Sequence, residues 1–143
     1  RGGEERLACE AAGIAVEVVP GVTSAVAVPA AAGIPVTHRG VARGFTVVTG
    51  HEDLPELPTG RDHTLVLLMG VATLARSVQL LLASGRDPEC PVAVVERGCT
   101  PSQRTTIGTL RTIADVAAAA GVDNPAVVVV GDVVRLHPHF VHD

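Results

Sequence analysis

Short apolar runs separated by glycine, proline and polar turns make up most of the chain and predict helices alternating with strands. Helices are expected where good helix formers cluster or apolar residues recur every three or four positions: residues 4–12, 23–33, 73–84 and 112–120. Strands are expected where β-branched residues stand together or alternate with polar ones: residues 14–19, 45–49, 64–69, 92–95, 103–109 and 126–130. This alternation is typical of an open α/β sheet.

The connections refine this expectation. The strand at 103–109 follows its neighbour too closely for a helical crossover, so we expect a mixed open sheet with flanking helices. The unbroken apolar run at 126–130 predicts a strand buried on both faces. Residues 52–62, which are rich in acidic residues and proline, are expected to form an exposed surface loop, and residues 137–143 a loose tail.

Composition narrows the class of protein. A chain of 143 residues is enough for one domain, and 47% hydrophobic with 18% charged residues argues against disorder. No apolar stretch approaches the roughly 20 residues that cross a bilayer, so we expect no membrane partner. A net charge of -4 and 1% aromatic residues disfavour nucleic acid as a partner.

Cysteine and arginine usage adds two expectations. The three cysteines, Cys9, Cys90 and Cys99, form no C-x-x-C pair and indicate reduced thiols in the cytoplasm. All eleven basic residues are arginine, which indicates compositional bias, so single arginines carry little weight. The sequence starts without Met or an apolar leader, and we expect it to be part of a longer protein.

Ligands of such sheets lie outside the carboxyl ends of strands. Glycine recurs just after the expected strand ends, which are Val19, Thr49, Met69, Val95 and Val130. Because glycine lets the backbone approach a ligand closely, this recurrence fits a ligand held by main-chain groups. Glycine is also common in turns between strands and helices, and that simpler interpretation stays open.

Four side chains near these ends are candidate ligand contacts. Thr23 and Ser24 offer hydroxyl groups, although capping the next helix is the favoured role. Met69 ends a strand where a site is expected, with core packing as the alternative. His51 follows another strand and either binds a ligand or faces solvent.

Several kinds of chemistry are disfavoured. The sequence contains no dinucleotide fingerprint, phosphate-binding loop or G-x-S-x-G elbow, so a hydrolase is not expected. Glu96 and Arg97 are interpreted as an ion-pairing strand end rather than as an acid and base. Three histidines near the end of the chain resemble a metal cluster only in composition, and a solvated tail is favoured for them: His137, His139 and His142.

Seven ordered segments carry a resemblance to a known family over nearly the whole chain. They are residues 18–25 (VVPGVTSA), 32–39 (AGIPVTHR), 45–51, 64–70, 91–98, 103–110 and 125–131. With these segments the sequence resembles the tetrapyrrole methylases, and among them those that methylate uroporphyrinogen III. The resemblance implies the carboxyl-terminal α/β domain of that fold.

The same resemblance implies transfer of methyl groups from S-adenosyl-L-methionine to ring carbons of uroporphyrinogen III. The product, precorrin-2, leads to cobalamin and sirohaem; the resemblance also implies a homodimer and no metal. In this family the cofactor lies in a cleft between two α/β domains. The matching cofactor positions are Thr23, Ser24, Met69 and Gly98, with Ala126 as a further candidate for the adenine pocket.

Three further positions match polar residues near the family's substrate trough: His38, Arg39 and His51. Cationic side chains there would suit the carboxylates of a tetrapyrrole. The family's amino-terminal half, with its Gly-rich cofactor loop and proposed acid/base residues, is not in this sequence, so the catalytic residues are expected outside it.

The resemblance divides the chain into three parts. Residues 1–13 are expected to end the amino-terminal domain as a hinge helix, residues 14–136 to form the carboxyl-terminal α/β domain, and residues 137–143 the tail. Alone, the chain is expected to bind cofactor weakly and not to turn over. The alternatives are a family member acting on a later precorrin or on RNA, which the weak basic character disfavours, or a non-catalytic ligand-binding or interaction domain.

Overall fold

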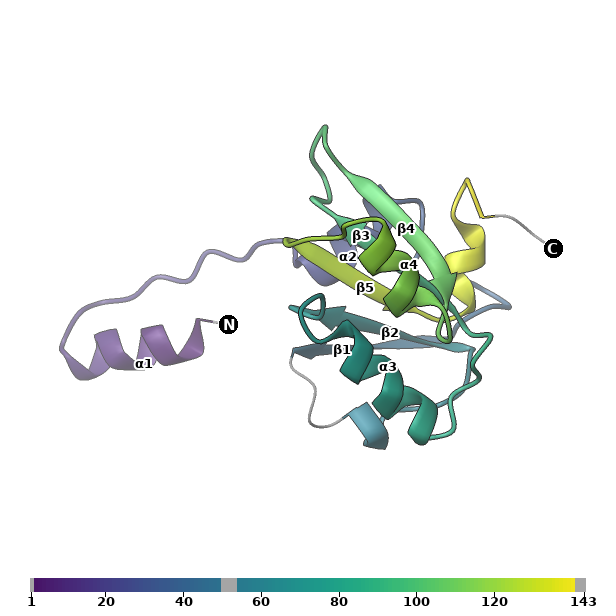
Figure 1. The fold of residues 1–143 in the computed structure, drawn as a ribbon. Coiled ribbons are helices and arrows are strands. Elements are labelled where there is room, and N and C mark those ends of the chain that lie inside the picture. Colours follow the sequence, from purple (N-terminus) through teal and green to yellow (C-terminus); the bar gives the residue numbers. More distant parts are fainter. Residues whose placement is uncertain (1, 50–53, 141–143) are drawn as a thin grey trace.

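The computed structural model describes residues 2–49 and 54–140 and has a five-stranded sheet between two layers of helices (Figure 1). The α-helices are α1 (Gly3–Ala11), α2 (Ser24–Ala31), α3 (Leu74–Ala83) and α4 (Ile113–Ala119). The strands are β1 (Gly44–Thr49), β2 (His63–Leu68), β3 (Pro91–Glu96), β4 (Arg104–Thr109) and β5 (Ala126–Val130). Two short 3-10 helices are η1 (Leu54–Glu56) and η2 (Asp132–Leu136).

The strand order β1-β2-β5-β3-β4 confirms the predicted mixed sheet. β1 and β2 are parallel, whereas β5 lies antiparallel between β2 and β3, and β4 pairs antiparallel with β3 at the sheet edge. The strands β1, β2 and β3 therefore end at the same edge of the sheet, and β5 begins there. The prediction that the segment after Val130 belongs to the ligand edge is wrong, because the reversed direction of β5 puts its carboxyl end at the opposite edge.

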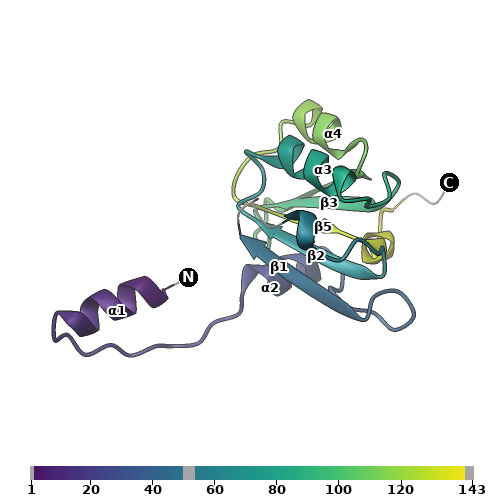
Figure 2. The same ribbon diagram turned by 90° about the horizontal axis from the view of Figure 1, so that it is seen from below.

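The helices cover both faces of the sheet (Figure 2). α3 and α4 pack on one face and α2 with η2 on the other, so alternate strand residues enter different cores. In β2, Leu65 and Leu67 enter the α3 core and Val66 enters the α2 core. β5 is buried on both faces, as its apolar run predicts. β1 is covered on one face only, which leaves Phe45 and Val47 about two-fifths exposed.

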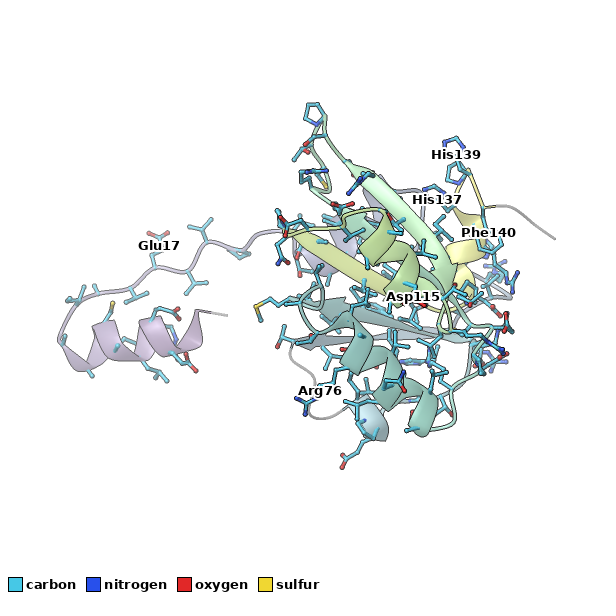
Figure 3. The ribbon with its side chains drawn as sticks, in the orientation of Figure 1. Glu17, Arg76, Asp115, His137, His139 and Phe140 are labelled. Atoms are coloured by element: carbon cyan, nitrogen blue, oxygen red, sulfur yellow. The ribbon has the colours of Figure 1, made fainter. Side chains whose placement is uncertain are left out.

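The strand predicted over residues 14–19 is not formed. These residues run extended and exposed between α1 and α2, and α1 buries no residue (Figure 1). Glu17 projects from this segment away from the domain (Figure 3). Val18 and Val19 are 68% and 81% exposed. Alternation of apolar and polar residues makes an extended backbone favourable, but a strand also needs a neighbour for its N–H and C=O groups, and the described part of the chain supplies none.

The loop predicted over residues 52–62 is exposed only in part. Residues 50–53 lie outside the described residues, while η1 places Leu54 fully inside the core against α3. The acidic and proline-rich composition of the segment gave no indication that Leu54 is buried. This burial holds the loop to the domain.

Two arginines, one buried and one partly buried, form hydrogen bonds that stabilise the opposite edge of the sheet, where β2 begins. The Arg86 guanidinium is 1% exposed and its Nη2 donates to the carbonyl oxygens of Pro58, Gly60 and His63 at 2.7, 3.1 and 3.1 Å. Desolvation by this burial lowers the pKa of Arg86. Nearby, Arg61 donates to Asp132 through Nε at 3.0 Å and Nη2 at 2.8 Å. None of the helices in the described ranges is long and apolar enough to span a bilayer.

Candidate functional site

A cleft of about 800 Å³ opens at the edge where β1, β2 and β3 end and β5 begins. Its volume suits a drug-sized organic ligand. The lining residues come from α2 and from every strand end at this edge: Ser24, Val28, Thr49, Leu68, Met69, Val95, Arg97, Gly98, Thr100, Ser102, Asn124, Pro125, Ala126 and Val127. Most of the lining is apolar, and hydroxyl, amide and guanidinium groups among the lining residues can form hydrogen bonds.

The N-terminus of α2 forms one wall of the cleft. Thr23 caps the helix by accepting a hydrogen bond from the backbone N–H of Ala25 at 3.2 Å, which confirms its capping role. Ser24 follows it and lines the cleft. One turn later, Val28 meets Gly98 so closely that a Cβ at Gly98 would lie 2.5 Å from Val28 Cγ1. Glycine at position 98 is therefore what lets the β3–β4 turn approach α2.

Left-handed backbone gathers around the cleft. Among residues 2–49 and 54–140, three non-glycine residues have positive φ: Met69 at 56°, Arg97 at 47° and Cys99 at 63°. Met69 and Arg97 line the cleft and Cys99 adjoins Gly98. Such conformations are unfavourable for side-chain-bearing residues and cluster at ligand sites. Met69 is 57% exposed, so its alternative role in core packing is wrong.

Hydrogen bonds hold the β3–β4 turn in place. The Thr100 hydroxyl donates to the Arg97 carbonyl at 2.6 Å, and Arg97 Nε donates to the Ser102 carbonyl at 3.2 Å. Gln103 Nε2 donates to the Ala31 carbonyl on α2 at 3.2 Å. The turn is thus fixed both internally and against α2, as a preformed wall requires.

The start of β5 forms the facing wall and is tied to the end of β3. The backbone N–H of Arg97 donates to the Pro125 carbonyl at 2.8 Å. The Glu96 carboxylate, only 1% exposed, accepts from Arg104 Nε at 2.6 Å and Nη2 at 2.9 Å. Arg97 Nη2 lies 3.8 Å from Glu96 Oε1, which confirms the predicted ion-pairing strand end, although Arg104 is the closer partner. The Arg104 guanidinium holds the pKa of Glu96 below its usual value, so the carboxylate stays ionised.

The structure brings together most of the predicted cofactor residues. Ser24, Met69, Gly98 and Ala126 all line the cleft, and Thr23 caps the helix beside it. Their role in binding a cofactor stays a prediction.

Of the three predicted substrate residues, the two that the structure describes do not line the cleft. His38 and Arg39 lie in the exposed loop before β1, at the edge where β1 and β2 begin, and His38 Nδ1 bonds the Arg39 carbonyl at 2.9 Å. His51 lies outside the described residues.

Sequence reasoning missed the cleft residues that precede β5 and those in the β3–β4 turn. They are Asn124, Pro125, Thr100 and Ser102, together with Arg97 as a wall residue. Both segments lie between elements that the sequence predicts, but their meeting depends on the antiparallel direction of β5. A hairpin of β3 and β4 beside an antiparallel β5 is the signal that would have found them.

The histidine and cysteine expectations have separate outcomes. His137 and His139 lie near Phe140 at the carboxyl end (Figure 3). The ring centroids of His137 and His139 are 5.7 Å apart, and burial lowers the pKa of His137. His142 lies outside the described residues. The described residues contain no group of three His, Cys, Asp or Glu side chains that could hold a metal ion. All three cysteines are free thiols, and burial raises the pKa of Cys90.

Comparison with known proteins agrees with the site. A sequence profile described as Tetrapyrrole (Corrin/Porphyrin) Methylases matches residues 1–114. The chain is 50% identical over 145 residues to the S-adenosyl-L-methionine-dependent uroporphyrinogen III methyltransferase of Methanosarcina barkeri, covering 96% of this chain and 57% of that protein. It is 47% identical over 146 residues to the uroporphyrinogen-III C-methyltransferase of Methanocaldococcus jannaschii, covering 95% and 59%.

Solved structures give the same result. The uroporphyrin-III C-methyl transferase of Thermus thermophilus complexed with S-adenyl homocysteine superposes with a TM-score of 0.77 at 42% identity, over 95% of this chain and 61% of that one. The chain thus spans between 57 and 61% of the length of these three relatives. The profile match over residues 1–114 and these identities show that the chain belongs to the tetrapyrrole methylase family.

Proposed function

We propose that this chain supplies the carboxyl-terminal part of an S-adenosyl-L-methionine-dependent uroporphyrinogen III C-methyltransferase, with the cleft holding the methyl donor. The observation that carries the proposal is the convergence of Ser24, Met69, Gly98 and Ala126 on one cleft. A relative of 42% identity whose structure was solved with S-adenyl homocysteine supports it. The volume of about 800 Å³ and a mostly apolar lining with a few polar groups suit a nucleoside with an amino-acid tail.

When bound, S-adenosyl-L-methionine supplies a methyl group on a sulfonium for in-line displacement by a ring carbon. In this proposal the chain's own residues bind and orient. Val28, Val95 and Val127 exclude water from the cleft floor, while Ser24 and Asn124 offer hydrogen bonds. Such fixed placement of the two reactants supplies much of the rate of a bimolecular transfer.

The exposed segment before α2 fits a protein that is larger than this chain. We propose that residues 14–19 pair as a strand with an amino-terminal domain, because their apolar side chains and backbone groups are uncovered here. Residues 1–13 would then be the hinge helix, residues 14–136 the carboxyl-terminal domain and residues 137–143 the tail. That amino-terminal domain would complete the cleft and supply the catalytic residues, so the chain alone would bind cofactor weakly without turnover.

The substrate and setting belong to the same proposal. His38, Arg39 and His51 would meet carboxylates of the tetrapyrrole, and the transfer would need no metal. The free thiols fit a cytoplasmic enzyme, and the exposed Phe45 and Val47 on β1 fit a homodimer contact. The product would serve sirohaem and cobalamin biosynthesis.

The test compares two proteins in one assay. Methyl transfer from labelled S-adenosyl-L-methionine to uroporphyrinogen III is measured for this chain alone and for a chimera. The chimera joins the chain to the part of the Methanosarcina barkeri relative that it does not cover. We expect the chimera to form precorrin-2 and the chain alone to form none. A correctly folded chimera that binds the donor but methylates no tetrapyrrole would contradict the proposed activity.

A further inference from the structure

The buried Glu96 carboxylate is the meeting point of three segments. The carboxylate accepts two hydrogen bonds from the Arg104 guanidinium on β4. Its Oε1 also accepts one from the backbone N–H of Asp123 at 3.1 Å. Arg104 Nη2 also donates to the Gly121 carbonyl at 3.1 Å. One ion pair therefore joins the end of β3, the start of β4 and the loop between α4 and β5.

Each joined segment continues directly into a wall of the cleft. Arg97 and Gly98 follow Glu96, Ser102 lies two residues before Arg104, and Asn124 follows Asp123. The carboxylate and guanidinium do not line the cleft themselves, so they act on a ligand only by setting the distance between its walls. Beyond the ladder that pairs β3 with β5, the Arg97 N–H also joins the walls by donating to the Pro125 carbonyl.

The chemistry of the pair suits fixed spacing. A guanidinium fork bonding both oxygens of a carboxylate has a defined geometry that one ammonium cannot reproduce. Because Glu96 is buried, removal of a partner leaves an incompletely paired charge, and the loop at Asp123 would move to restore hydration.

We propose that Glu96 and Arg104 are positioning residues that set the separation of the two cleft walls and thereby the affinity for S-adenosyl compounds. The proposal rests on the proposed function of the cleft. It assigns to the pair a role in ligand binding beyond holding β3 to β4.

The test is Arg104→Lys, with Arg61→Lys as the matched control. Arg61 also donates two hydrogen bonds to a carboxylate, both to Oδ1 of Asp132, but at the opposite edge of the sheet. Binding of S-adenosylhomocysteine is measured by calorimetry at a temperature where circular dichroism shows both variants folded. We expect about tenfold weaker binding for Arg104→Lys, as displaced supporting groups produce, and a change under about twofold for Arg61→Lys. Equal weakening in both variants, or unchanged binding in Arg104→Lys, would overturn the proposal.

Amide hydrogen exchange separates this inference from the proposed function. Arg104→Lys should speed exchange at the Asp123 and Arg97 amides, whereas Arg61→Lys should leave both unchanged. If the unmodified chain binds no S-adenosylhomocysteine, that result contradicts the proposed function. Faster exchange at the two amides in Arg104→Lys would still support the positioning of the walls by this pair. Unchanged exchange at both amides would refute it. Glu96→Gln, which keeps the shape and removes the charge, should reproduce the Arg104→Lys result.

Discussion

The contact between Gly98 and Val28 makes the substitution Gly98→Ala a sharp test of the cleft wall. The added Cβ would lie 2.5 and 2.6 Å from the two Val28 methyl carbons and 2.9 Å from its Cβ. Ordinary carbon contacts are about 3.5–4.0 Å, so the overlap is about 1 Å. Val28 is buried and β-branched, and its χ1 is restricted in a helix, so α2 itself has to move.

Such overpacking costs about 1–3 kcal/mol of unfolding free energy. Urea unfolding followed by far-ultraviolet circular dichroism measures it, since the chain has no Trp and no Tyr to report by fluorescence. Gly70→Ala is the matched control: its Cβ would find Leu67 Cβ at 3.5 Å and Val128 Cγ2 at 3.6 Å, which are ordinary contacts. We expect Gly70→Ala not to destabilise the protein and to change its unfolding free energy by at most about 1 kcal/mol.

A double-mutant cycle completes this prediction. Val28→Ala removes both methyl groups and leaves one contact at 2.9 Å, so it should relieve part of the strain in Gly98→Ala. The double variant should then be more stable than the sum of the single effects by about 0.5–2 kcal/mol. Additivity within about 0.3 kcal/mol would refute the argument that Gly98 is required by its approach to α2.

Three other outcomes follow from the structure. Leu54→Ala should lose about 2–5 kcal/mol of unfolding free energy because it empties a core position, while Leu136→Ala, at a 38% exposed site, should lose far less in the same urea assay. Thr23→Ala should cost about 1 kcal/mol through the lost helix cap, and Thr23→Ser should restore most of it in thermal melts. Because the pKa of Glu96 is lowered in the fold, its stabilisation is complete above its unfolded pKa of about 4.3 and is lost as pH falls through the folded value. Between pH 6 and 3, the unfolding free energy measured by urea titration should therefore fall less steeply in Glu96→Gln than in the unmodified chain. Equal slopes would contradict the assignment of this stabilisation to Glu96.

Much of the fold could be predicted from the sequence because its strands are short β-branched runs with clear breakers. β3, β4 and β5 lie where their patterns placed them, and the close spacing of β3 and β4 correctly excluded a helical crossover between them. The prediction of a strand over residues 14–19 is wrong because an alternating pattern does not show whether a neighbouring strand is available to pair with it. The burial of Leu54 was not predicted because a single apolar residue within a polar segment gives no periodic pattern.

The cleft was predictable only in part for a topological reason. Met69 and Gly98 follow strands that end at the ligand edge, so the rule of strand ends found them. Asn124 and Pro125 precede a strand, and only the reversed direction of β5 brings them to the same edge. The left-handed backbone at Arg97 depends on the hydrogen bonds of the finished turn, which no local propensity indicates.

We propose that S-adenosyl compounds bind at the edge of the sheet where β1, β2 and β3 end. Amide chemical-shift mapping of this chain during titration with S-adenosylhomocysteine tests it most directly. We expect shifts concentrated at Met69, Gly98 and Ala126, with none at His63 or Asp132 on the opposite edge. Shifts concentrated at the opposite edge, or none anywhere at millimolar ligand, would contradict it.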